Sequence, residues 1–164
     1  MPQAEPQRRL PRVLAGATAL LLAARVLSPE PKSLVQWVPL EVAVHAARQS
    51  RKPILYYFSA EWCSPCRKLE RTVFASAQTA REVGERFVPV KVMDREQEEG
   101  KNPPAVEELQ KRFNVSGFPT LVVARTDGSL VARVVGLGGG ASSIRRFLSR
   151  SSLDAHRPRP AAGS

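Results

Sequence analysis

The sequence predicts a single α/β domain, and three observations support this fold class. Segments with apolar residues at helical spacing alternate along the chain with short, continuous apolar runs that suit strands. Residues 54–58 (Ile-Leu-Tyr-Tyr-Phe) form the strongest such run, as expected of a central strand buried on both faces. Without a compositionally biased head (residues 1–28) and tail (residues 151–164), the 164-residue chain keeps about 120 residues, which is enough for one core.

Helices are expected both before and after this central strand in the sequence. Apolar residues at helical spacing predict a first helix over residues 40–48, closed by a short polar loop. After the strand, residues 67–72 and 78–86 have helical composition. Phe74 and Ala75 are expected to mark a bend between these two helical segments.

The next strand is expected over residues 87–93 (Phe-Val-Pro-Val-Lys-Val-Met). Because Pro89 has no backbone N–H to donate, this strand should lie at a sheet edge or carry a bulge. Residues 94–102 are dominated by charged side chains and are expected to form a loop. A helix is then predicted over residues 105–112.

A hairpin and a helix complete the domain. Two apolar runs, residues 121–124 and 130–135, flank a Thr-Asp-Gly turn, which is a strong hairpin signal. The glycine-rich residues 136–140 interrupt the chain, and a final helix is expected over residues 142–149, capped by its first two serines. The predicted order is therefore helix, strand, helix, strand, helix, strand, strand, helix.

The net charge of +10 is concentrated at the two ends of the chain. Residues 1–28 carry four arginines against one glutamate, and residues 145–164 carry five arginines against one aspartate. The central part of the chain has nearly equal numbers of basic and acidic residues. It has no basic stripe interleaved with aromatic side chains, which argues against a nucleic-acid partner. Residues 151–164, rich in Arg, Pro, Ala and Ser, are expected to be a disordered basic tail.

The head has the pattern of an export signal, because three arginines precede an apolar run. An uncleaved membrane tether through residues 13–27 is an alternative, although such a helix spans only about 22 Å of a core about 30 Å thick. An organelle transit peptide is a further alternative. The protein is thus expected in the periplasm or another extracytoplasmic compartment, with a linker at residues 29–39 and the folded domain at residues 40–150.

Cys63 and Cys66 are the only cysteines of the chain, and their spacing indicates redox chemistry. A bridge between them closes too short a loop to act as a structural staple, and a zinc site would need four ligands. The pair lies where the central strand ends and a helix begins, so the helix N-terminus should stabilise a thiolate on Cys63. Cys63 is therefore expected to be the accessible nucleophile and Cys66 the more buried resolving thiol, with Pro65 shaping the first turn.

The segment Gly117-Phe118-Pro119-Thr120 is a second signal, about fifty residues after the cysteines. An ordinary trans proline at the start of a strand is one interpretation. A cis Phe118–Pro119 bond is the other, and it would expose the backbone of Phe118 beside the cysteines to an extended substrate chain. The neighbouring Cys-x-x-Cys pair favours the cis interpretation and a substrate-binding role for Phe118 and Pro119.

These motifs resemble those of the thioredoxin-fold superfamily over residues 40–150. The carrying features are Ala-Glu-Trp-Cys-Ser-Pro-Cys at residues 60–66, Pro119 with Thr120, and the glycine segment at Gly136. Residues 62–74 are also similar to the C-terminal domain of the bacterial thiol:disulfide interchange protein. The resemblance implies a central mixed β-sheet flanked by helices. It also implies a monomer without a metal or organic cofactor, which exchanges a dithiol with protein thiols or disulfides and with an upstream redox partner protein.

The chain departs from the family pattern at Tyr57, where thioredoxins usually carry a buried aspartate that accepts the proton of the second cysteine. Glu70, one helical turn after Cys66, is the candidate replacement, with Glu61 as a second candidate. A solvated glutamate on a helix face is the alternative interpretation of Glu70. Trp62 is expected to pack beside the cysteines.

The absence of a histidine between the cysteines favours a reductant over a disulfide donor. Two other functions compete with a thiol:disulfide oxidoreductase. One is a binding, assembly or chaperone module of the same fold without turnover, which an intact Cys-x-x-Cys pair argues against. The other is a copper-handling relative, which would need a Cys-x-x-x-Cys spacing and a late histidine.

Overall fold

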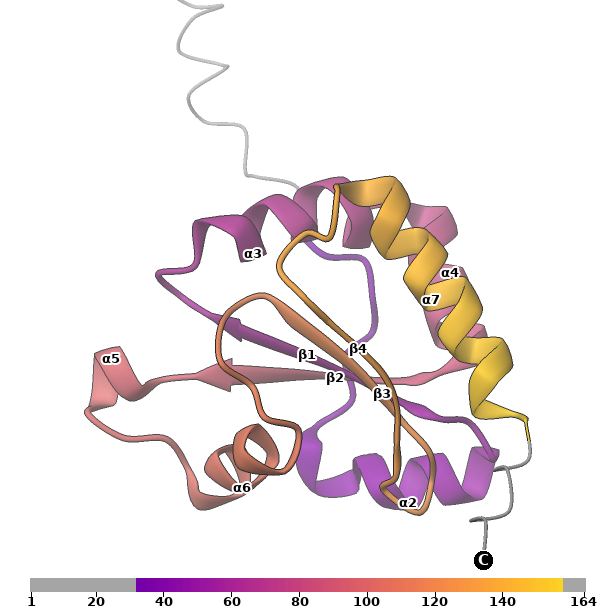
Figure 1. Ribbon diagram of the computed structural model, residues 1–164, viewed down its shortest axis with the longest axis horizontal. Helices are drawn as coiled ribbons and strands as arrows, with labels where there is room; N and C mark the ends of the chain where they lie inside the picture. The colour runs from indigo at the N-terminus through magenta and orange to yellow at the C-terminus, as the bar shows by residue number, and fades with distance from the viewer. Residues whose placement is uncertain (1–31, 158–164) are drawn as a thin grey trace, which may run out of the picture. The chain divides into compact units, whose positions relative to one another are not determined.

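The computed structural model describes residues 32–157, and all structural statements below concern this range. The predicted head, at residues 1–28, lies outside it. The prediction that residues 29–39 are a linker is wrong for its later part, because the N–H of Leu34 donates to the carbonyl of Phe74 at 2.8 Å and Val35 is buried in the core. The described chain forms a four-stranded sheet with six α-helices and one π-helical turn (Figure 1). In chain order these are α2 (Leu40–Ser50), β1 (Ile54–Ala60), α3 (Ser64–Leu69), η1 (Glu70–Phe74), α4 (Ala77–Arg86), β2 (Val88–Asp94), α5 (Glu96–Glu99), α6 (Pro104–Arg112), β3 (Thr120–Ala124), β4 (Leu130–Val135) and α7 (Ala141–Ala155).

The sheet is mixed, with strand order β2-β1-β3-β4. The pairing of β1 with β2 is parallel, whereas β3 pairs antiparallel with both β1 and β4. All seven residues of β1 are buried, so the prediction of a central strand from its apolar run is confirmed. The edge position of β2 is confirmed as well, and it accommodates Pro89 because an edge strand needs N–H donors on one side only.

Helices cover both faces of the sheet (Figure 1). The chain crosses over from β1 to β2 through α3, η1 and α4, which lie with α7 on one face, while α2 and α6 lie on the other. Successive β1 side chains alternate between the two layers: Leu55 and Tyr57 join the core under the first group, and Ile54, Tyr56 and Phe58 join the core over the second. This α/β architecture confirms the predicted fold class.

Some helices differ from the prediction. The helix predicted over residues 67–72 begins at Ser64 and passes into η1 at Glu70. Residues 96–99, assigned to a loop, form the short helix α5, which has no buried residue and hence no apolar pattern to reveal it. The last helix begins at Ala141 after the N-cap Gly140, so the prediction that Ser142 and Ser143 cap it is wrong. Gly140 has a φ of 100°, a backbone conformation that glycine adopts without strain.

The predicted tail also starts too early, because α7 continues through Ala155. Ser151 and Ser152 are buried, and the Ser151 hydroxyl donates a hydrogen bond to the carbonyl of Phe147 one turn before it. Residues 151–155 therefore belong to the folded domain, since burial and helical hydrogen bonding offset their polar composition.

Candidate functional site

The helix α3 begins where β1 ends, and Cys63 is its N-cap. The Cys63 carbonyl accepts hydrogen bonds from the backbone N–H groups of Cys66 (3.1 Å) and Arg67 (3.3 Å). The Cys63 sulfur also accepts from the Cys66 N–H, at 3.1 Å. Pro65 occupies the first turn, where a missing N–H costs no helical hydrogen bond. The helix thus presents a backbone donor to the sulfur of Cys63, which favours a thiolate there.

Cys63 and Cys66 form a disulfide, with their Cα atoms 5.3 Å apart. Each residue is only 1% exposed, so the expectation that Cys63 is more accessible than Cys66 is wrong for this oxidised form. Both cysteines belong to the core cluster under α3 and α7, and Phe118 packs against that cluster. Cys63 is therefore buried, although it lies at the start of a surface helix.

Two aromatic side chains from distant parts of the chain meet beside the disulfide. The ring of Trp62, the residue before Cys63, contacts the ring of Phe118 edge to face, with centroids 5.8 Å apart. Trp62 is 48% exposed, which is unusual for a tryptophan beside a core. Phe118 is partly buried and contacts the cores on both faces of the sheet.

Two hydrogen bonds hold the segment at the start of β3, residues 117–120, in place. The Phe118–Pro119 peptide bond is cis, and the Pro119 carbonyl accepts a 2.7 Å hydrogen bond from the N–H of Gly136 at the end of β4. The Thr120 hydroxyl donates to the Gly117 carbonyl, at 2.6 Å. These bonds fix the backbone of this segment next to the start of α3.

A groove of about 280 Å³ opens beside the aromatic pair. Its walls come from the end of β2, from α5 and α6, and from the segment before Pro119. The lining residues are Trp62, Asp94, Glu96, Gln97, Gln110, Val115, Ser116, Gly117 and Phe118. The groove thus reaches the residue before Cys63, although neither cysteine is among its lining residues.

Asp94, at the end of β2, holds one wall of this groove in place. This carboxylate is 5% exposed and accepts hydrogen bonds from the side-chain amides of Asn102 and Gln110, both at 2.7 Å. Its other oxygen accepts the backbone N–H of Glu96, at 3.2 Å. The Asn102 amide oxygen in turn accepts the N–H of Arg95, at 2.7 Å. One buried acid therefore ties α5 and α6 to the strand.

Glu70 lies one helical turn after Cys66, at the point where α3 passes into the π-helical turn η1. Its Oε1 accepts hydrogen bonds from the Tyr57 hydroxyl (3.2 Å) and from the Lys91 ammonium group (2.7 Å). The Tyr57 hydroxyl also lies 3.3 Å from the carbonyl of Cys66. Glu70 is thus not a freely solvated residue, and Tyr57 connects its carboxylate to the peptide of the second cysteine.

Tyr57 is a hydrogen-bond donor at this position, not a base. Burial raises the pKa of its hydroxyl far above the ordinary value of 10.0, and the negative charge of Glu70 raises this pKa further. The hydroxyl consequently keeps its proton at neutral pH. Among the side chains of this cluster, the Glu70 carboxylate is the one able to accept a proton.

The other predicted carboxylate points elsewhere. The Glu61 side chain is 56% exposed and pairs with Arg95 at 3.3 Å, on the α5 side of the site. Two contributors were not predicted: Lys91, which pairs with Glu70, and Asp94. For Lys91 the signal was present, because it is the only charged residue in the apolar run of residues 87–93.

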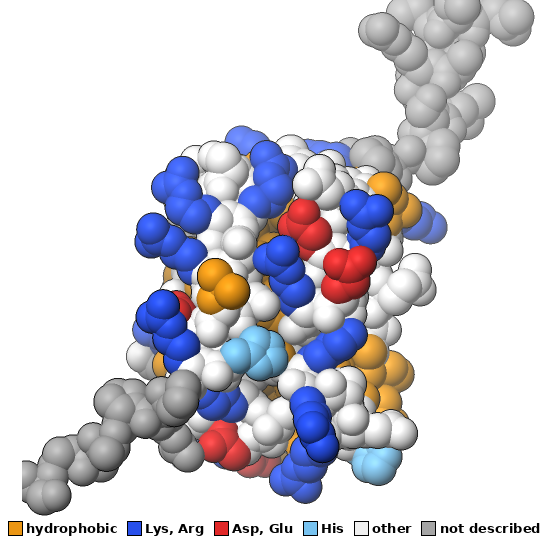
Figure 2. Space-filling model, turned by 90° about the vertical axis from the view of Figure 1, so that its right-hand side faces the viewer, with side chains coloured by type: hydrophobic (Ala, Val, Ile, Leu, Met, Phe, Trp, Pro, Cys, Tyr) orange, Lys and Arg blue, Asp and Glu red, His pale blue; other side chains and the backbone are white. Residues whose placement is uncertain are grey.

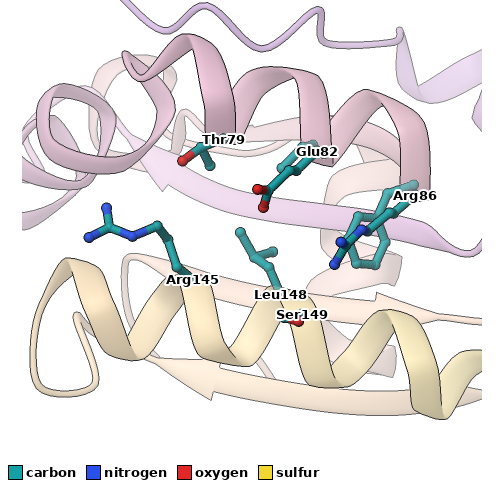
Figure 3. Close-up of a pocket in the computed structure, with 8 residues that line it drawn as sticks. Thr79, Glu82, Arg86, Arg145, Leu148 and Ser149 are labelled. Atoms are coloured by element: carbon teal, nitrogen blue, oxygen red, sulfur yellow. The ribbon is translucent and has the colours of Figure 1, made fainter.

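Another cavity of the described residues lies away from the cysteines. A cavity of about 10 Å³, about one water molecule in size, lies between α4 and α7, where Arg86 and Arg145 flank Glu82 (Figure 3). On the face of the domain seen in Figure 2, basic side chains predominate over acidic ones and are spread among uncharged ones. Within residues 32–157 there is no metal-binding group of His, Cys, Asp and Glu, and no helix is long and apolar enough to cross a membrane.

Comparisons with known proteins agree with this geometry. The family model described as a thioredoxin-like domain matches residues 40–148. The disulfide bond reductase DsbH of Chlamydia pneumoniae is 29% identical over 127 residues, which span 73% of this chain and 74% of that protein. A solved DsbH oxidoreductase covers 92% of this chain and 95% of its own at 20% identity, with a TM-score of 0.63.

The oxidised C-terminal domain of DsbD from Neisseria meningitidis has a TM-score of 0.51 at 23% identity, over 82% of this chain and 95% of its own. At such identities the two solved structures show a shared fold. The family match covers most of the described domain and includes both cysteines. The chain therefore belongs to the thioredoxin-like family.

Proposed function

We propose that this protein is a thiol:disulfide oxidoreductase that reduces disulfide bonds in protein substrates. The observation that carries the proposal is the Cys63–Cys66 disulfide at the start of α3, where the Cys63 sulfur accepts the N–H of Cys66. A helix N-terminus stabilises the thiolate that attacks, and the second sulfur is already within bonding distance of the first. The chain therefore carries both thiols that exchange requires.

In the reaction, the Cys63 thiolate attacks one sulfur of the substrate disulfide. A Cys63–substrate bond forms, the substrate bond breaks, and the substrate's other sulfur leaves as a thiolate that takes up a proton. Cys66 then loses its proton and attacks the Cys63 sulfur, which releases the second substrate thiol. Two electrons pass from the dithiol to the substrate, and an upstream dithiol protein must reduce the Cys63–Cys66 bond again.

Glu70 is the residue we assign as proton acceptor for Cys66. It lies one helical turn after Cys66, and the Tyr57 hydroxyl contacts both the Glu70 carboxylate and the Cys66 carbonyl. Lys91 and Tyr57 act as positioning residues, because both donate to Oε1 of Glu70. The exposed Glu61, paired with Arg95, has no part in this step.

The direction of exchange, reduction of the substrate, has two supports. Ser64 and Pro65 provide no histidine between the cysteines, and the curated relative from Chlamydia pneumoniae is named a disulfide bond reductase. The reduction potential of the pair, measured against glutathione, tests this direction. A value near −270 mV, about that of thioredoxin, is expected, and a value near −120 mV would make the protein an oxidant.

Substrate chains are expected to bind along the segment that precedes β3. The backbone of Phe118 is available to hydrogen-bond an extended chain beside the cysteines, and the groove next to Trp62 leads to the same point. Such binding is independent of sequence at the backbone level. It suits a protein that acts on more than one partner.

Reduction of insulin by the described domain tests the activity. The wild-type protein should precipitate insulin chains in the presence of dithiothreitol, and Cys63→Ser should reduce this rate to background. Cys66→Ser should accumulate a mixed disulfide through Cys63 that nonreducing electrophoresis detects. Equal background rates for wild type and Cys63→Ser would instead favour a binding or assembly module without turnover.

The place of action follows from the head of the chain. We infer export from the arginines and the apolar run within residues 1–28, which precede the folded domain. Fractionation of cells that express the full chain tests this inference. Recovery with periplasmic or membrane fractions is expected, and recovery with cytoplasmic proteins would contradict it.

A further inference from the structure

The end of the sheet that lies opposite the cysteines is flanked by basic residues. Cys63 follows the end of β1, whereas β1 and β2 run parallel and both begin at the other end of the sheet. Ala124, where β3 ends, pairs with Ile54, where β1 begins, so β3 ends there too. Basic residues adjoin each of these strand ends: Arg51 and Lys52 before β1, Arg86 before β2, and Arg125 after β3. The topology thus brings positive charge together at the end remote from the cysteine pair.

The last helix extends this positively charged surface. The Arg125 side chain donates to the carbonyl of Asp154 at 3.2 Å and lies 3.5 Å from that of Arg157, so the end of α7 lies beside the end of β3. Arg150 is exposed on the same helix, and Leu153 is 67% exposed. Basic side chains with an exposed apolar one among them are typical of helices that lie on a membrane surface.

Basic residues outnumber acidic ones at this end of the domain. They also predominate on the face seen in Figure 2, which is the side of the molecule that carries α4 and α7 in Figure 1. We call this surface the basic end, and it comprises Arg48, Arg51, Lys52, Arg86, Arg125, Arg145, Arg150 and Arg157. The acidic residues among them are Glu82, Glu85, Asp127 and Asp154. No ion pair within the described residues involves Arg51, Arg86 or Arg150, so these charges are available to a partner.

The cysteine end of the domain does not carry this excess of positive charge. Its exposed acids, Glu61, Glu96, Glu98 and Glu99, are matched by Arg67, Lys68, Arg95 and Lys101. An anionic surface therefore attracts the basic end more strongly than the cysteine end, and the difference gives the contact an orientation.

We propose that the basic end docks on a membrane surface that contains anionic phospholipids, with Leu153 at the level of the headgroups. Each exposed arginine is attracted by the negative surface potential, and its guanidinium group matches the geometry of a phosphate. A nucleic acid is the less suitable polyanion, because the strongly exposed aromatic ring of the described residues, Trp62, lies at the cysteine end and cannot stack with bases at the basic end.

Docking in this orientation leaves the cysteine pair open to soluble partners. The Cys63–Cys66 disulfide lies beyond the other end of β1, so the membrane and the reacting sulfurs are on opposite sides of the sheet. The proposal does not depend on thiol exchange, and it goes beyond the export inferred above by naming the surface that contacts the lipid.

Sedimentation with lipid vesicles tests the docking. The full chain is mixed with vesicles of phosphatidylcholine alone or with added phosphatidylglycerol. Binding to the anionic vesicles should be at least about tenfold tighter than to the neutral ones. This gain should disappear when the salt concentration rises from about 0.1 M to about 1 M, because the Debye length falls from about 10 Å to about 3 Å.

The triple variant Arg51→Gln/Arg86→Gln/Arg150→Gln should bind the anionic vesicles about tenfold more weakly than wild type. These three side chains are exposed and form no ion pair within the described residues, so the fold should be preserved. Insulin reduction measured without vesicles should equal that of wild type, because the three positions lie at the end remote from Cys63. Residues 1–31 are the same in both proteins, so any attachment through the head is common to them.

The matched control is Arg67→Gln/Lys68→Gln/Lys101→Gln, which removes the same amount of charge from exposed positions at the cysteine end. Its affinity for anionic vesicles should stay within about twofold of wild type, because these positions face away from the lipid. Equal losses of affinity in the two triple variants would overturn the proposal, since they would show a response to net charge alone.

The orientation is tested with Leu153→Trp and vesicles whose acyl chains carry bromine, which quenches nearby tryptophan fluorescence. The added ring should be quenched. The native tryptophans should be quenched little, because Trp37 is partly buried and Trp62 lies at the cysteine end. Equal quenching in wild type and variant would contradict docking through the basic end.

Duplex DNA separates a membrane surface from a general polyanion surface. DNA added at the same phosphate concentration as the lipid should leave the protein on the vesicles, and its release would overturn the proposal. Failure of thiol exchange looks different: wild type would then not reduce insulin, while its binding to anionic vesicles would persist.

Discussion

Tyr57 and Lys91 lie directly opposite each other in the parallel register of β1 and β2, and both donate a hydrogen bond to the same oxygen of Glu70. The Lys91 ammonium group also lies 5.8 Å from the centre of the Tyr57 ring. Strand pairing thus supplies both donors, and the turn after α3 supplies the carboxylate. This arrangement places an acid near Cys66 without a charged residue on β1 itself.

Glu70→Gln should lengthen the lifetime of the mixed disulfide through Cys63 about tenfold or more, because the amide cannot accept the Cys66 proton. Rapid quench with an insulin-derived peptide disulfide measures this lifetime. The matched control is Glu107→Gln, an exposed acid on α6, which should behave as wild type. An unchanged lifetime in Glu70→Gln across neutral pH would remove Glu70 from the mechanism.

Lys91→Met should lower the free energy of unfolding by about 1 kcal/mol, because it leaves the half-buried Glu70 carboxylate with Tyr57 as its remaining side-chain donor. Urea denaturation at neutral pH measures the difference. Lys68→Met removes an exposed lysine from α3 and should change stability by much less. Equal effects of the two substitutions would show that the Lys91–Glu70 pair contributes little.

Tyr57→Phe should make the protein less sensitive to alkali. Burial raises the pKa of Tyr57, so above its ordinary value of 10.0 the unfolded chain releases a proton that the folded chain keeps. Stability is therefore unaffected below about pH 10 and falls as the pH rises from there towards the pKa of the folded state. The variant should not lose stability in this alkaline range. At pH 7 it should be about 1 kcal/mol less stable than wild type, because it lacks the hydrogen bonds of the hydroxyl.

Urea midpoints measured from neutral to strongly alkaline pH check this prediction. Tyr56→Phe is a useful comparison, since burial raises the pKa of Tyr56 as well and these are the two tyrosines of the chain. The double variant should have the flattest alkaline profile. Parallel profiles for wild type and Tyr57→Phe would show that the hydroxyl titrates normally.

Asp94→Asn should destabilise the domain by about 1–3 kcal/mol, since its new amide group would face the donor groups of Asn102 and Gln110. Asp154→Asn, at an exposed ion pair on α7, is the control and should have little effect. Denaturation measures both, and hydrogen exchange should rise in α5 and α6 of the Asp94 variant alone. Loss of stability without faster exchange there would argue against a tethering role.

The strands could be predicted from sequence because continuous apolar runs and a Thr-Asp-Gly turn are local signals. The end of α7 could not, since Ser151 and Ser152 have the composition of a tail and become buried through tertiary packing. The helix α5 gave no signal either, because its four residues are all exposed. The local sequence pattern therefore predicted the strands, whereas the ends of the helices depend on tertiary contacts that the pattern does not show.

The chemistry of the cysteine pair was visible in its spacing and in its position after a buried strand. The role of Lys91 was not, because it depends on the register that brings Lys91 opposite Tyr57. The burial of Cys63 was missed for a similar reason, since the core cluster that contains it includes residues from distant parts of the chain. The spacing of the cysteines predicts the reactive pair, whereas the exposure of Cys63 depends on tertiary structure.

The tether at Asp94 has a consequence for how partners dock. Because a buried acid anchors α5 and α6 to the end of β2, the far wall of the groove is preorganised, and ordering it costs little entropy on association. Most of the conformational entropy lost on docking is then that of the incoming chain. Unstructured or locally unfolded clients and rigid folded ones should consequently differ in affinity even when they make the same contacts.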